Sequence, residues 1–133
     1  MTSMAIATLY VGLFGLLMLA LKFRVGQVRT QEKVGFGDGG NEAMQRAIRV
    51  QGNAVEDVPL VVLGLVVLGA MAAPGWLIHV LGATFFVGRV LHAVGLGGSS
   101  GGSFGRAAGT LLTALMQLAT AGACIWFAVA QLL

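Results

Sequence analysis

The sequence predicts an all-α fold, a bundle of four membrane-spanning helices that forms one domain over residues 1–133. Two observations lead to this prediction. Charged residues make up 10% of the chain and apolar residues 57%, whereas a soluble domain is about 25% charged. The charges also leave long uncharged runs, and about 20 apolar residues suffice for a helix to cross the hydrocarbon core. A disordered chain and a soluble enzyme with a solvated surface are both excluded.

The uncharged runs place the four helices. Residues 2–21, 58–88 and 107–133 carry no charge, and the second of these runs is divided by Pro74 and Gly75. We therefore expect helices over about 3–27, 41–72, 75–96 and 105–131. The intervening segments 35–41 and 95–105 are rich in glycine and serine, which predicts a flexible turn and a linker.

The basic residues predict the orientation in the membrane. All of them flank the first or the third connection: Lys22, Arg24, Arg29, Lys33, Arg46 and Arg49, then Arg89 and Arg106. Lys and Arg are enriched in cytoplasmic loops, so both connections are expected in the cytoplasm and both termini outside. No basic residue precedes the first apolar run, which favours an uncleaved span over a signal peptide. This topology accounts for the basic charge better than nucleic-acid binding does.

A polar stripe on the second predicted helix is the main functional signal. Its members follow one another at spacings of four, three, four and three residues: Glu42, Arg46, Arg49, Asn53 and Glu56. At helical periodicity they share an arc of about 80°. Charged groups at membrane depth usually face a bundle interior or a cavity and pair with one another. Two interpretations stay open, an ion-pair network that fixes helix packing and a ligand site.

The other helices add basic residues at the level of the stripe. Arg89 and His92 share one face of the third helix, and we expect Arg89 either to reach the interface or to pair with Glu56 or Asp57. The five arginines predict a basic pocket for a small anion with several carboxylates: Arg29, Arg46, Arg49, Arg89 and Arg106. An apolar co-substrate could reach it from the lipid. No metal site is expected, because the two histidines lie on different faces of one helix.

Three segments resemble the MAPEG family, the membrane-associated proteins of eicosanoid and glutathione metabolism. They are R-A-I-R-V-Q-G-N-A-V-E-D-V-P at 46–59, G-Q-V-R at 26–29 and F-V-G-R-V-L-H at 86–92. The likeness is greatest to the bacterial branch and implies an inner-membrane homotrimer with glutathione between subunits near the cytoplasmic side. It places glutathione contacts at Arg29, Arg49, Asn53, Glu56 and His92, with Arg46 and Arg89 in the same pocket. It makes Arg106, aligned with a one-residue shift, the cation that stabilises the thiolate.

The resemblance implies a glutathione-dependent transferase or peroxidase that acts on lipophilic electrophiles. The chain departs from some glutathione-dependent members, because Leu96 and Thr110 stand approximately where those members have tyrosines. An alternative is therefore a non-catalytic MAPEG scaffold that binds a lipid or a small anion, or an accessory subunit of a larger membrane complex. A small multidrug exporter is disfavoured, because that class resembles a design with an isolated acid early in the first helix, and this chain has none there.

Overall fold

The structure is a computed structural model that describes residues 2–98 and 101–133. It contains α1 (Ser3–Gln31), α2 (Glu42–Ala70), α3 (Gly75–Gly98) and α4 (Phe104–Leu132), and the described residues contain no strand. The predicted all-α bundle is confirmed. α1 runs four residues past the expected end near 27, because no glycine or proline follows Gly26 before Gly35. α3 runs two residues past the expected end near 96, and residues 99 and 100 of the expected linker lie outside the described residues.

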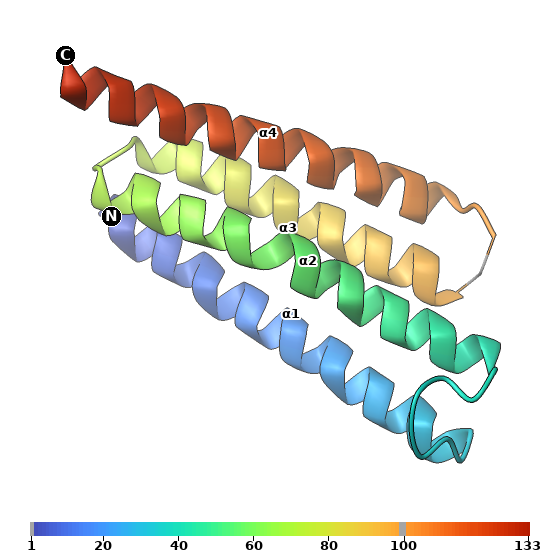
Figure 1. The fold of residues 1–133 in the computed structure, drawn as a ribbon. Coiled ribbons are helices and arrows are strands. Elements are labelled where there is room, and N and C mark those ends of the chain that lie inside the picture. The colour runs from blue at the N-terminus through green and yellow to red at the C-terminus, as the bar shows by residue number, and fades with distance from the viewer. Residues whose placement is uncertain (1, 99–100) are drawn as a thin grey trace.

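The helices form an antiparallel bundle in which α2 and α3 lie between α1 and α4 (Figure 1). α1 packs on α2 and α3, and α4 packs on the same two helices, while no contact joins α1 and α4 in the described part of the chain. The largest core cluster fills the half of the bundle near the termini, where the rings of Phe14 and Phe85 lie 5.2 Å apart. The opposite half has only a small apolar cluster around Val28, Met44 and Ala47.

Three short polar side chains fix where helices begin. The side chains of Thr2, Asn41 and Ser103 each accept a hydrogen bond from the backbone N–H of the residue three positions later, with donor–acceptor distances of 3.3, 2.9 and 3.2 Å. Such N-caps satisfy donors that the first helical turn leaves unpaired. The Ser103 cap matters most for the site, because its partner is the backbone nitrogen of Arg106.

Glycines bring α4 against α3 at the polar end of the bundle. A Cβ atom on Gly109 would lie 2.5 Å from the backbone nitrogen of His92, and one on Gly105 would lie 3.1 Å from the carbonyl oxygen of Leu91. Small residues let membrane helices approach this closely. The first turns of α4, and Arg106 with them, are therefore held directly beside α3.

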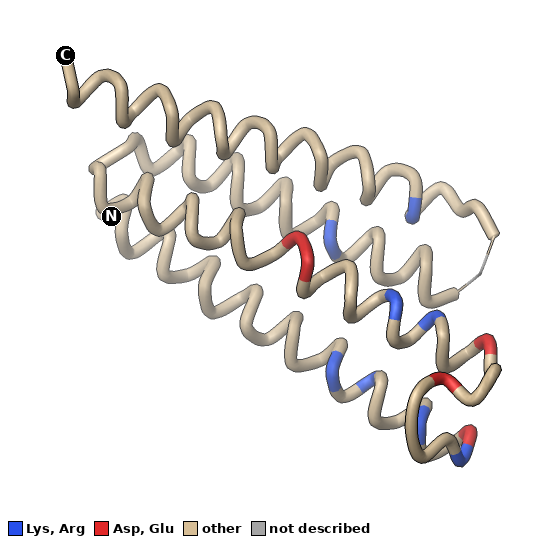
Figure 2. The backbone as a smooth tube through the Cα atoms, viewed as in Figure 1, with Lys and Arg blue, Asp and Glu red and all other residues tan. Residues whose placement is uncertain are grey.

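All four helices are long and apolar enough to cross a membrane. Figure 2 shows that the charged residues gather in the half of the bundle that holds the α1–α2 and α3–α4 connections, whereas the half with the termini is free of them. The charge asymmetry expected from the sequence is therefore present in space. Which side of the membrane each end faces remains a prediction.

Candidate functional site

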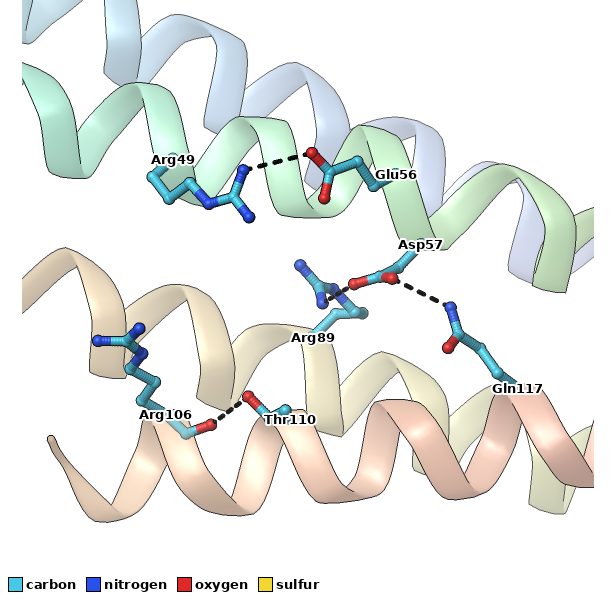
Figure 3. Close-up of polar contacts among 7 residues, drawn as sticks. All are labelled: Arg49, Glu56, Asp57, Arg89, Arg106, Thr110 and Gln117. Carbon is cyan, nitrogen blue, oxygen red and sulfur yellow. Dashed lines mark hydrogen bonds and ion pairs between the residues drawn. The ribbon is translucent and has the colours of Figure 1, made fainter.

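A buried ion pair joins α2 and α3 in the middle of the bundle. Arg89 is 2% exposed, and its Nη1 donates to Oδ2 of Asp57 at 2.7 Å. The second carboxylate oxygen, Oδ1, accepts from Nε2 of Gln117 on α4 at 3.0 Å. Three helices are thus tied together through one carboxylate (Figure 3). Of the two partners expected for Arg89, the structure selects Asp57, and the alternative that Arg89 reaches the interface is wrong.

A second ion pair lies on the outward face of α2. Arg49 Nη1 donates to Glu56 Oε1 at 3.3 Å, and the two side chains are 63% and 60% exposed in the single chain. Glu56, the other acid expected as a partner of Arg89, does not pair with that buried guanidinium, whose partner is Asp57. The reason is helical geometry, since the adjacent positions 56 and 57 point about 100° apart and only the second faces α3.

A hollow of about 250 Å³ lies at the polar end of α2, α3 and α4. Its lining residues are Glu42, Gln45, Arg46, Arg49, Leu96 and Arg106. Arg46 pairs with Glu42 at 3.0 Å within this lining. The hollow therefore presents three guanidinium groups and one carboxylate to any molecule that enters it. A net positive pocket of this kind suits a ligand with more than one negative group.

Five of the expected site residues do not line this hollow, and one of them, Glu56, is the partner of Arg49 described above. Arg29 instead donates from Nη1 to the carbonyl oxygens of Val34 and Gly37, at 3.2 and 3.1 Å, and so holds the α1–α2 connection. That connection turns through Gly37, Gly39 and Gly40, which all have positive φ.

The remaining three lie deeper in the bundle. Arg89 is engaged with Asp57, and His92 is buried one turn further along α3. Nδ1 of His92 has no hydrogen-bond partner among the described residues. Asn53 is half-buried on α2, one turn before Asp57. The single chain thus brings together Arg46, Arg49 and Arg106, and it separates them from Arg29.

Sequence reasoning missed Gln117, although a signal for it was present. Polar residues and one thiol recur along α4 at spacings of three, four, three and four residues: Thr110, Thr113, Gln117, Thr120 and Cys124. This is the period of one helix face. Thr113 and Thr120 are buried, so much of this helix face points toward the interior of the bundle. Residues 107–133 carry no charge, and this polar face was therefore not among the expected site features.

An apolar groove of about 540 Å³ lies between α2 and α4, and on α2 it begins one turn beyond Glu56. Leu60, Leu63 and Val67 line its α2 side, and Gln117, Thr120 and Cys124 line its α4 side. The Cys124 thiol donates to the carbonyl oxygen of Gly64 at 3.8 Å. The groove is open toward the lipid in the single chain, and its polar end is the amide that bonds Asp57. Among the described residues no group of His, Cys, Asp and Glu could hold a metal ion.

Four apolar spanning helices with charges confined to one half define an integral membrane four-helix bundle. The chain belongs to the MAPEG family, whose model matches residues 7–126. It is similar to the inner membrane protein YecN of Escherichia coli strain K12, with 36% identity over 90 residues that cover 68% of this chain and 69% of YecN. YecN of E. coli O6:H1 gives the same values. No solved structure matches the chain.

Proposed function

We propose that the hollow at the polar end of the bundle binds glutathione and presents its thiol to lipophilic electrophiles or peroxides. The observation that supports this proposal is the meeting of Arg46, Arg49 and Arg106 from two helices in one hollow, opposite a single carboxylate. Glutathione carries two carboxylates and one ammonium group at neutral pH. The arginines suit the carboxylates, and Glu42 suits the ammonium group.

The proposed roles of the arginines differ with their positions. Arg46 and Arg49 lie on the α2 stripe and would hold the charged ends of the tripeptide, together with Asn53 and Glu56. Arg106 lies in the first turn of α4, where its cation adds to the partial positive charge of a helix N-terminus. A cation in that position favours a thiolate over a thiol. The thiolate is the nucleophile for attack on an electrophilic carbon or a peroxide.

The active form in this proposal is a homotrimer. Arg49 and Glu56 are more than half exposed in the single chain, although both lie on a helix that crosses the membrane. Charged groups at membrane depth face protein or water rather than lipid, so a neighbouring copy would cover this face of α2. The neighbour would also bring its Arg29 to the shared site. Native mass spectrometry of the detergent-solubilised protein should show three copies, and a monomer would contradict the proposal.

The apolar groove between α2 and α4 supports a lipophilic co-substrate. It opens laterally and starts one turn from Glu56, so a molecule dissolved in the bilayer could approach the basic hollow without crossing water. The polar side chain of Gln117 at the groove wall would meet the polar part of such a molecule. The co-substrate would enter the groove from the surrounding membrane lipid.

We further propose an inner-membrane location with the basic connections in the cytoplasm and both termini outside. The supporting observations are the one-sided distribution of Lys and Arg and the similarity to YecN, an inner membrane protein. Because Cys124 is the only cysteine, a Cys124→Ala chain can receive single cysteines at Thr2 or Asp38. A membrane-impermeant maleimide on intact cells should label the Thr2→Cys chain and spare the Asp38→Cys chain. The reverse pattern would contradict the orientation.

Calorimetric titration of the purified protein with glutathione tests the proposed ligand. Saturable binding that is lost in Arg49→Ala and retained in Lys22→Ala would support it, because Lys22 is exposed on α1 outside the hollow. Absence of binding at millimolar glutathione would favour the second candidate, a non-catalytic scaffold or accessory subunit. One observation favours that candidate: among the described residues no hydroxyl side chain lines the hollow, and the Thr110 hydroxyl donates to the backbone carbonyl of Arg106 at 2.8 Å.

A further inference from the structure

A second basic hollow, of about 240 Å³, lies between α1, α2 and α3 on the neighbouring face of α2. Two arginines line it, Arg24 from α1 and Arg46 from α2, and Arg46 stands between this hollow and the one described above. The other walls are apolar or glycine, and include Leu21, Val94 and Gly97. The hollow therefore combines two cations with walls that suit a hydrocarbon chain.

In the part of the chain that the structure describes, no carboxylate lines this hollow. Glu42 pairs with Arg46 from outside it, and the Glu42 side chain is 68% exposed. Arg24 pairs with no carboxylate among the described residues. A guanidinium group at a membrane surface without an internal counter-ion attracts an external anion.

The position of Arg24 limits which anion this is. It lies seven residues before the end of α1 at Gln31, which is about 10 Å along the helix axis. Val94, which lines the hollow, is 71% exposed, so the opening is bordered by an apolar side chain. Arg24 thus lies at a depth where its long side chain meets lipid headgroups rather than open water.

We propose that this hollow binds one anionic phospholipid from the leaflet beside the basic connections. Its phosphate would lie between Arg24 and Arg46, and an acyl chain would run along Leu21 and Val94. Basic pockets between membrane helices recognise such headgroups through charge-assisted hydrogen bonds. The two proposed sites share Arg46, but they can be tested separately, because Arg24 and Gly97 do not line the first hollow.

The test uses the full chain in neutral detergent, titrated with phosphatidylglycerol, phosphatidylcholine or inorganic phosphate, with bound molecules counted by native mass spectrometry. Phosphatidylglycerol should bind more tightly than phosphatidylcholine, and Arg24→Gln should weaken it about fivefold, the effect of one basic residue near an anionic surface. The matched control is Lys22→Gln, which removes the same charge from α1 outside the hollow and should change binding less than twofold. Equal losses in the two variants would overturn the proposal in favour of general surface attraction.

A second pair of variants tests the hollow without changing charge. Leucine at Gly97 would occupy part of the hollow, and a Cβ atom there meets no other atom within 4 Å, so the fold should tolerate it. Gly97→Leu should weaken phosphatidylglycerol binding, whereas Gly12→Leu, also free of clashes and outside the hollow, should not. Displacement of the lipid by equimolar inorganic phosphate would overturn the proposal in favour of a small-anion site. Glutathione binding should remain within twofold in Arg24→Gln, which separates this test from that of the proposed function.

Discussion

Replacing Asp57 by alanine should destabilise the protein more than any other single change of an acidic residue. Asp57 is the recorded partner of a guanidinium that is 2% exposed, because Arg89 bonds it through Nη1 while its Nε and Nη2 atoms have no partner among the described residues. Asp57→Ala would leave a buried positive charge without its ion-pair partner. It would also strip Gln117 of its acceptor.

The expected loss of unfolding free energy differs between the Asp57–Arg89 ion pair and the Gln117 hydrogen bond. Removing one partner of a buried ion pair costs about 3–5 kcal/mol, because the remaining charge is left uncompensated. Hydrogen bonds between membrane helices average only about 0.6 kcal/mol, so Gln117→Leu should cost much less than Asp57→Ala. Replacing both charges by leucine in the Asp57→Leu, Arg89→Leu double variant should recover most of the loss, because no charge is then buried.

The assay is denaturant unfolding of the detergent-solubilised protein, followed by circular dichroism. The matched control is Glu32→Ala, which removes an exposed carboxylate that accepts from Nδ2 of Asn41 at 2.8 Å, and exposed polar contacts contribute about 0–1 kcal/mol. If Asp57→Ala and Glu32→Ala have the same free energy of unfolding, the ion pair does not hold the bundle together and this reasoning is refuted.

Two further predictions concern the site and the helix contact beside it. Arg49→Ala should weaken glutathione binding and leave the turnover rate at saturating glutathione nearly intact. Arg106→Ala should keep the glutathione affinity within about tenfold and lower that turnover rate. Calorimetry and steady-state kinetics measure the two quantities, and identical effects in the two variants would refute the division of roles. Gly109→Leu should lower the unfolding midpoint, because its Cβ atom would lie 2.5 Å from the α3 backbone. Gly122→Leu should leave the midpoint unchanged, because a Cβ atom there meets nothing within 4 Å. Equal midpoints in the two variants would show that α4 does not depend on close contact with α3.

Much of the fold could be predicted because the membrane imposes simple rules on sequence. A long uncharged run that crosses a bilayer forms a helix, because its backbone polar groups must be hydrogen-bonded internally. The break at Pro74 and Gly75 separates α2 from α3 as expected. The charge asymmetry followed from the positions of Lys and Arg alone. Helix ends were less certain, since polar residues such as Thr30 and Gln31 fit a helix and a loop equally well.

The candidate site was harder to predict, because it depends on which faces of different helices meet. The spacing on α2 correctly grouped Glu42, Arg46 and Arg49, which lie along one hollow. It gave no means of choosing between the adjacent acids at 56 and 57, since that choice depends on where α3 packs. Gln117 was missed for the same reason, because an amide gains its role only through a carboxylate on another helix.

The most direct test of the account is the ultraviolet absorbance of the glutathione thiolate when the purified protein is titrated near neutral pH. The account predicts a thiolate signal that saturates with binding and falls in Arg106→Ala, while binding itself is largely kept, because the cation at the start of α4 stabilises the charged sulfur. Glutathione that binds without any thiolate signal, or a full signal in Arg106→Ala, would contradict the catalytic account and favour the non-catalytic scaffold.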